Sequence, residues 1–171
     1  MTTRYIELHA RSAFSFLRGA SVPEELIAIC ADLKMPAMAL LDCDGVYGAP
    51  RFHMAATKNN IKAHIGAEVT LKLDRDAQTK RPDAAIVSLP LLVQSRAGYQ
   101  NLCRLITRMK LRTAKHPKPG KEPSATLDEL AEFSEGLLCL LQLLFKIFQA
   151  DLFILSICFL NFFVDSFDLF L

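Results

Sequence analysis

Short apolar runs alternate, over the first 140 residues, with segments whose apolar positions recur every three to four residues. The short runs predict strands, and the three-to-four spacing predicts helices with one buried face. We therefore expect strands at residues 5–9, 37–41, 61–73, 85–94 and 136–140, and helices at residues 22–33, 49–59, 98–112 and 126–133. This order of elements predicts an α/β fold with parallel strands, amounting to about half of a (β/α) barrel.

Two local signals refine these boundaries. Ser21 and Glu24 stand three residues apart with Pro23 between them, which is the spacing of a capping box at the start of a helix. Pro90 interrupts the fourth apolar run, and its missing N–H predicts a bulge or an edge strand. The polar residues 74–84 predict a surface loop.

Chemically reactive side chains lie in or directly after three of the predicted strands. His9 ends the first strand, Asp42, Cys43 and Asp44 follow the second, and Glu68 lies in the third. Because the carboxyl ends of parallel strands meet at one edge of a sheet, we expect these side chains to converge. Histidine, thiol and carboxylate groups in one place predict a metal site or the remains of one.

Residues 141–171 change composition abruptly to Leu, Phe and Ile. Their longest charge-free window, residues 152–164, is 13 residues long, whereas a membrane-spanning helix needs roughly 20. We therefore predict a domain at residues 1–140 followed by an apolar helical tail at residues 141–171, with a membrane anchor as the less favoured alternative. The absence of turns and amphipathic order in the tail is typical of out-of-frame translation.

Composition narrows the classes of protein that fit. A charged fraction of 22% with 51% hydrophobic residues is that of a globular protein. A formal net charge of +2 does not by itself indicate nucleic-acid binding, although residues 96–121 hold eight Lys or Arg and no Asp or Glu. Within that stretch Arg104, Arg108 and Arg112 form a helical stripe that either is solvated or contacts DNA phosphates or a partner. Five widely spaced cysteines and no signal sequence favour the cytoplasm.

Four ordered motifs carry a family resemblance: His9-Ala10-Arg11-Ser12, residues 39–49 (Ala-Leu-Leu-Asp-Cys-Asp-Gly-Val-Tyr-Gly-Ala), residues 61–69 and Gly98-Tyr99-Gln100-Asn101-Leu102. Together they resemble the N-terminal polymerase-and-histidinol-phosphatase (PHP) domain of bacterial C-family DNA polymerases, and most of all the error-prone branch of the polymerase III alpha subunits. The resemblance covers about residues 5–140. It implies a truncated or frameshifted product that lacks the polymerase palm, thumb and fingers.

The resemblance also implies a metal site whose ligands are partly replaced. Metal-competent members carry His-x-His-Ser, Thr-Asp-His and a glutamate at the first three strands. His9 and Glu68 match that pattern, while Arg11 and Cys43 stand where two of the histidines would be. Arginine cannot ligate a cation, so we expect Arg11, with Arg18, to replace the metal's charge through an ion pair to Glu68 or Asp44.

Two functions from different classes follow from the resemblance. The first is a catalytically silent domain of an error-prone polymerase in damage-tolerant DNA synthesis, with DNA and replication or repair proteins as partners of the full-length parent and no cofactor of its own. The second is a metal-dependent phosphoesterase using a divalent Zn²⁺, Mn²⁺ or Mg²⁺ at a residual site formed by His9, Cys43 and Glu68. Whether this chain is itself an enzyme is left open.

Overall fold

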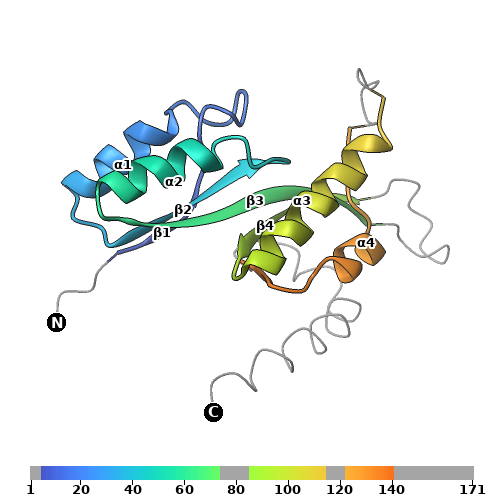
Figure 1. The fold of residues 1–171 in the computed structure, drawn as a ribbon. Helices are drawn as coiled ribbons and strands as arrows, with labels where there is room; N and C mark the ends of the chain where they lie inside the picture. Colours follow the sequence, from blue (N-terminus) through green and yellow to red (C-terminus); the bar gives the residue numbers. More distant parts are fainter. Residues whose placement is uncertain (1–4, 74–84, 115–121, 141–171) are drawn as a thin grey trace, which may run out of the picture. The chain divides into compact units, whose positions relative to one another are not determined.

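The computed structural model describes residues 5–73, 85–114 and 122–140, all within the unit Met1–Leu140. The elements are, in chain order, β1 (Glu7–Ala10), α1 (Pro23–Asp32), β2 (Ala37–Cys43), α2 (Ala49–Lys58), β3 (Lys62–Leu73), β4 (Ala85–Val93), α3 (Arg96–Leu111), α4 (Leu127–Glu132) and β5 (Leu137–Cys139) (Figure 1). Each lies within a few residues of its predicted position, so the α/β prediction is confirmed. The predicted loop at residues 74–84 and the predicted tail at residues 141–171 lie outside the described residues.

The five strands form one sheet in the order β1-β2-β3-β4-β5. The pairs β1–β2 and β2–β3 are parallel as predicted, but β3–β4 and β4–β5 are antiparallel. The prediction that all strands run parallel is therefore wrong for β4. No helix intervenes between β3 and β4, and a parallel pair needs a crossover, usually a helix, that antiparallel neighbours do not.

Two further local predictions are corrected. The strand β4 lies between β3 and β5, so Pro90 is not on an edge; its carbonyl accepts a hydrogen bond from Leu140 N at 2.9 Å. At the start of α1 the N-cap is Val22, whose backbone N–H donates to Glu25 Oε2 at 3.2 Å, and Glu24 is not part of the cap. Because Pro23 takes the first helical position, the residue before it must be the cap, one place later than the sequence suggested.

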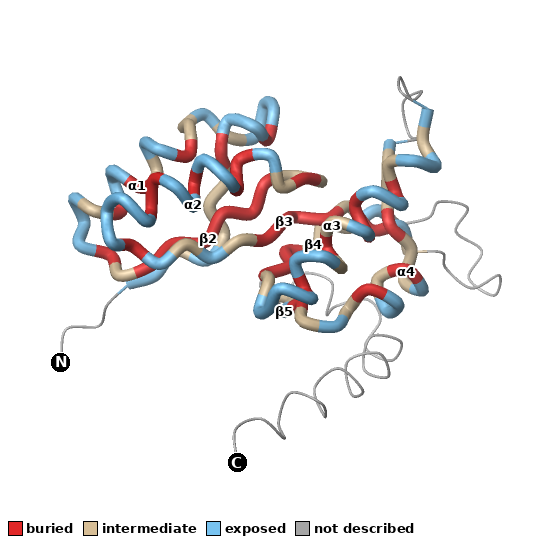
Figure 2. The backbone as a smooth tube through the Cα atoms, viewed as in Figure 1, coloured by how far each residue is buried: buried red, intermediate tan, exposed pale blue. Residues whose placement is uncertain are grey.

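The four helices of the described residues pack on one face of the sheet, and alternation along β3 shows why. Ala63 and Ile65 lie in the apolar cluster of α1 and α2, and Ala67, Val69 and Leu71 lie in that of α3 and α4. These odd-numbered positions share one face because successive strand side chains alternate. Figure 2 shows the burial concentrated along β2 and β3 beneath the helices. The even-numbered residues of β3, including Glu68, point to the opposite face.

No helix in the described ranges is long and apolar enough to span a bilayer.

Candidate functional site

The loop that leaves β1 (residues 11–22, the β1–α1 loop) is held to β2 by a buried carboxylate. Asp42 is 1% exposed and accepts hydrogen bonds from Ser12 N at 2.8 Å and from the hydroxyls of Ser12 and Ser15 at 2.8 and 2.7 Å. Ser15 Oγ in turn accepts from Cys43 N at 3.0 Å. A buried charge is tolerated when its oxygens are hydrogen-bonded. Asp42 therefore fixes the loop to the sheet.

Glu68 holds a second cluster, on the other face of the sheet. Its Oε2 accepts hydrogen bonds from Arg11 Nε at 2.6 Å and from His9 Nε2 at 3.1 Å, and its Oε1 accepts one from Ser88 Oγ at 2.5 Å. A terminal nitrogen of Arg11 also pairs with Oε2. The side chains of Arg11 and His9 are partly exposed, while Glu68 is 3% exposed. The predicted ion pair between Arg11 and Glu68 is confirmed.

Glu68 is held in its ionised form although it is buried. Burial raises the pKa of its carboxyl, but hydrogen bonds from Ser88, His9 and Arg11, with the charge of Arg11, lower it further than burial raises it. The resulting pKa lies below the ordinary range of glutamate. Glu68 is thus a buried anion, and the guanidinium of Arg11 supplies the positive charge that neutralises it.

Cys43, Asp44 and Arg18 lie beside this cluster with partners of their own. Asp44 accepts hydrogen bonds from Thr70 N at 2.7 Å and from Thr70 Oγ1 at 2.8 Å, so it continues the sheet contacts of β3 past the end of β2. Asp44 is therefore not the partner of Arg11, which was the alternative. A terminal nitrogen of Arg18 donates to Cys43 Sγ at 3.4 Å. Burial and the charge of Asp44 raise the pKa of the Cys43 thiol, which disfavours the thiolate that a metal requires.

The predicted convergence of acidic residues is only partly right, and strand alternation is the reason. In the β2–β3 register Cys43 is opposite Glu68, and Asp42 is opposite Ala67. Residues opposite each other share a face, so Asp42 and Glu68 point to different sides of the sheet. His9, Arg11 and Glu68 come together, whereas Asp42 joins the β1–α1 loop.

These donors do not fit a divalent metal. Across residues 5–73, 85–114 and 122–140, no group of three or more His, Cys, Asp or Glu side chains is arranged to hold one. Both oxygens of Glu68 already accept hydrogen bonds. A carboxylate only accepts, so His9 Nε2 carries the proton in this contact and has no lone pair for a metal.

The predicted arginine stripe on α3 has partners on and near α4. Arg108 pairs with Glu132 and lies 4.5 Å from the centre of the Phe133 ring, and Arg112 pairs with Glu129 at 2.8 Å. These contacts hold α4 against α3. In the described part of the chain Arg104 is exposed and has no recorded ion-pair partner. The nucleic-acid role of the stripe stays a prediction.

Four hydroxyl residues in these clusters were missed by the sequence analysis: Ser12, Ser15, Thr70 and Ser88. Ser12 and Ser15 left no local signal, because the carboxylate that they bond, Asp42, lies 30 and 27 positions away. Ser88 had none, because its contact with Glu68 depends on β4 running antiparallel to β3.

Comparison with known proteins gives a consistent set of matches. A family model described as the PHP domain matches residues 7–155. The error-prone DNA polymerase of Mycobacterium tuberculosis (strain H37Rv) is 44% identical over 132 residues, and that of Mycolicibacterium paratuberculosis is 42% identical over the same length. Each match covers 77% of this chain and 12% of the relative. The error-prone DNA polymerase of Anaeromyxobacter sp. (strain K) is 43% identical over 105 residues, covering 61% of this chain and 9% of the relative.

Among solved structures, a putative metal-dependent phosphoesterase from Bifidobacterium adolescentis superimposes with a TM-score of 0.48 at 16% identity, covering 64% of this chain and 34% of that one. An amidohydrolase from Chromobacterium violaceum gives a TM-score of 0.46 at 24% identity, covering 62% and 33%.

Proposed function

The chain belongs to the PHP domain family, and from that premise we propose that it is the PHP part of an error-prone DNA polymerase in which an arginine has replaced the metal. The proposed parent copies damaged templates with DNA and replication or repair proteins as partners. This part has no metal-dependent activity of its own. The similarity to the polymerases supports the parent, although the chain spans only 12% of the length of the first relatives it matches.

The proposal that this part has no metal-dependent activity, the silent-site proposal, rests on one observation. Both oxygens of Glu68 already accept hydrogen bonds, from Arg11, His9 and Ser88. A guanidinium cannot lose its proton at any relevant pH, so the pair with Arg11 persists where a metal would have to bind. Arg11 thus gives Glu68 the charge balance that a cation gives in a metal-dependent member, without its Lewis acidity. The cytoplasm is part of the same proposal, because Cys30, Cys43, Cys103 and Cys139 are free thiols in the structure.

A metal-dependent phosphoesterase is the alternative, favoured by the contact between His9 and Glu68, two residue types that ligate metals. Titration calorimetry of the full chain with Mn²⁺ and Zn²⁺, followed by hydrolysis of a bis(p-nitrophenyl) phosphate ester, separates the two functions. We expect no stoichiometric metal binding and no hydrolysis.

A variant designed to bind a metal ion provides the positive control. Arg11→His with Cys43→His supplies two neutral imidazoles next to Glu68 and should bind one metal ion, whereas Arg51→His with Cys103→His, a matched pair away from Glu68, should not. Uptake of one equivalent of metal by the wild-type chain that is abolished by Glu68→Gln would refute the silent-site proposal and establish the alternative.

A further inference from the structure

The β1–α1 loop presents large apolar side chains to solvent from a rigid base. Phe16 is 83% exposed and Leu17 is 88% exposed. The backbone of the loop is closed by hydrogen bonds to Ser15 O from Arg18 N at 2.8 Å and from Gly19 N at 2.9 Å, and Ser15 itself is anchored on Asp42. Leu17 has a φ of +61°, a left-handed conformation unfavourable for leucine. The surrounding bonds hold this strain, so the tip is preorganised.

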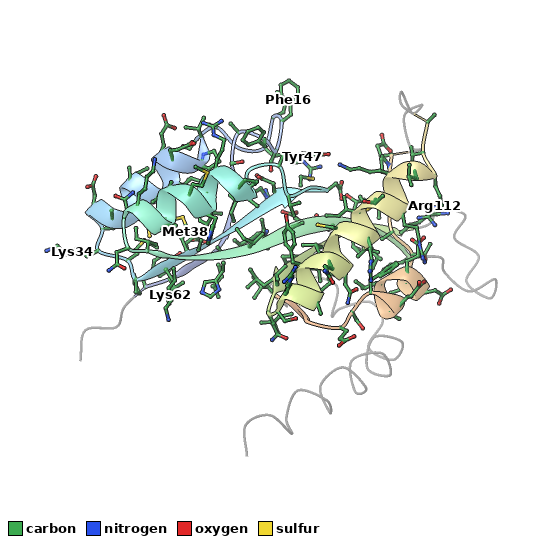
Figure 3. The ribbon with its side chains drawn as sticks, viewed as in Figure 1. Phe16, Lys34, Met38, Tyr47, Lys62 and Arg112 are labelled. Atoms are coloured by element: carbon green, nitrogen blue, oxygen red, sulfur yellow. The ribbon has the colours of Figure 1, made fainter. Side chains whose placement is uncertain are left out.

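The loop between β2 and α2 (residues 44–48, the β2–α2 loop) adds a second exposed ring. Tyr47 is 58% exposed. The β1–α1 loop is bound to the last residue of β2, directly before the β2–α2 loop, because Ser15 Oγ accepts a hydrogen bond from Cys43 N and Arg18 contacts Cys43 Sγ. Figure 3 labels both Phe16 and Tyr47 where these loops leave the sheet. We call Phe14, Phe16 and Tyr47, with their neighbouring cations, the aromatic rim.

Each part of the aromatic rim has a cation beside it. The Arg51 guanidinium lies 5.7 Å from the centre of the Phe14 ring, and the Lys110 ammonium lies 4.7 Å from the centre of the Tyr47 ring. Arg18 is exposed at the base of the tip. Arg51 also pairs with Glu24. Within the described ranges, Arg18 contacts Cys43 Sγ and Lys110 donates to the Tyr47 hydroxyl, so neither cation of the rim is paired with a carboxylate there.

The segments that build the rim contain one acidic residue, Asp44 at the start of the β2–α2 loop. Residues 8–23 and 45–67 contain no Asp or Glu, and neither do residues 96–114, which include Lys110. Asp44 is bound to Thr70, and Asp42 is bound to Ser12 and Ser15. Glu24 is paired with Arg51. Exposed rings flanked by cations match the chemistry of single-stranded nucleic acid, whose bases stack on aromatic faces and whose phosphates seek positive charge.

We propose that the aromatic rim binds single-stranded DNA, with bases stacked on Phe16 and Tyr47 and phosphates held by Arg18 and Lys110. The choice of DNA rests on the proposed function, because the relatives are DNA polymerases. The rim borders the Glu68 cluster through Arg18, which contacts Cys43 Sγ, but the groups proposed to bind DNA differ from those that hold Glu68, which are Arg11, His9 and Ser88. The base of the loop depends on Asp42, on the opposite face of the sheet from Glu68.

Fluorescence anisotropy of the full chain with a labelled oligothymidine tests the proposal. A base stacked on an aromatic ring contributes enough that its replacement by alanine weakens binding about fivefold or more. We expect such a loss for Phe16→Ala and for Tyr47→Ala, and a smaller loss for Tyr47→Phe, which keeps the ring but removes the hydroxyl that accepts a hydrogen bond from Lys110 Nζ. Arg18→Ala should also reduce the slope of log affinity against log salt by about 0.7, as for one phosphate contact on a single strand.

Matched controls lie at the other end of α1. Leu33→Ala removes an exposed apolar side chain, and Lys34→Ala removes an exposed cation. Because neither residue belongs to the aromatic rim, both variants should bind the oligonucleotide as the wild-type chain does. Thermal unfolding followed by circular dichroism should show that Phe16→Ala and Tyr47→Ala remain folded, since both side chains are exposed.

Absence of binding to the wild-type chain at about 50 mM salt, where phosphate contacts are strong, would overturn the proposal. So would oligonucleotide binding that Phe16→Ala and Tyr47→Ala leave unchanged; that result would assign the exposed tip to a protein partner instead. Metal titration reports on the Glu68 cluster and not on the rim, so failure of DNA binding and failure of the silent-site proposal give different results.

Discussion

Replacement of Arg11 by methionine is the sharpest test of how Glu68 is held in the sheet. Methionine keeps most of the aliphatic volume of arginine and removes the charge, leaving Glu68, 3% exposed, with His9 and Ser88 as hydrogen-bond donors. Breaking a fully buried ion pair by removing one partner costs about 3–5 kcal/mol. The Arg11 side chain is 31% exposed and therefore partly screened, so we expect a loss of about 2 kcal/mol in the free energy of unfolding at neutral pH.

The pH dependence of this loss distinguishes electrostatics from packing. In the wild-type chain the pKa of Glu68 is lowered, so its stabilisation is present above the unfolded pKa of about 4.3 and is lost as the pH falls through the folded pKa. Without Arg11, its hydrogen bond and its charge no longer lower the folded pKa of Glu68, which therefore rises. The difference in stability between wild type and Arg11→Met should therefore be largest near neutrality and shrink as Glu68 becomes protonated in acid.

Urea unfolding followed by far-ultraviolet circular dichroism at neutral and acidic pH measures both quantities. Arg51→Met is the matched control, because its pair with Glu24 is half exposed and should contribute little. Adding Glu68→Gln to Arg11→Met should recover part of the lost stability, since the unpaired charge is then gone. A loss for Arg11→Met that equals that of Arg51→Met, or that does not depend on pH, would refute the reasoning.

Three other predictions follow from the same contacts. Asp42→Ala should destabilise the chain by about 2 kcal/mol or more in urea unfolding, because it leaves the buried Ser12 N–H and the hydroxyls of Ser12 and Ser15 without the carboxylate that accepts their hydrogen bonds; an unchanged midpoint would contradict this. Gly48→Ala should lower the melting temperature, since its Cβ would lie 2.7 Å from Asp42 Oδ2, and the effect should be smaller in an Asp42→Ala background, where Leu40 Cδ2 and Ser12 Oγ remain at 3.0 Å. Burial raises the pKa of the Cys139 thiol to about 11, so iodoacetamide at about pH 8 should label it far more slowly in the folded chain than in urea, where its pKa is about 8.5; equal labelling by mass spectrometry would argue against burial.

Much of the fold was predictable because helices and strands leave local signals. The apolar spacing in α1, α2 and α3 and the short runs of β2 and β3 placed these elements within a few residues of the structure. The cap of α1 was misplaced by one residue because Ser21 and Glu24 also match the motif. The direction of β4 was not predictable from its own residues, since an apolar run has the same pattern in either direction.

The candidate site was predictable in its ionisable residues, but not in its hydroxyl residues and only partly in its geometry. His9, Arg11 and Glu68 were expected together and are together, and the choice of Glu68 over Asp44 as the partner of Arg11 came from the structure. Asp42 was expected beside Glu68 and lies on the other face. Arg108 and Arg112, predicted to be solvated or to contact DNA phosphates or a partner, are bound to α4 because the chain folds Glu129 and Glu132 back onto α3.

The sequence by itself determined where the elements lie, which residue types stand at the strand ends, and that Arg11 stands close to the candidate ligand His9. The tertiary structure alone decided which face each side chain takes and which group neutralises it. The physical reason is the range of the interactions. Periodicity acts between residues a few positions apart, whereas Glu68 meets Arg11 and Ser88, 57 and 20 positions away. The register and direction of the strands fix such contacts.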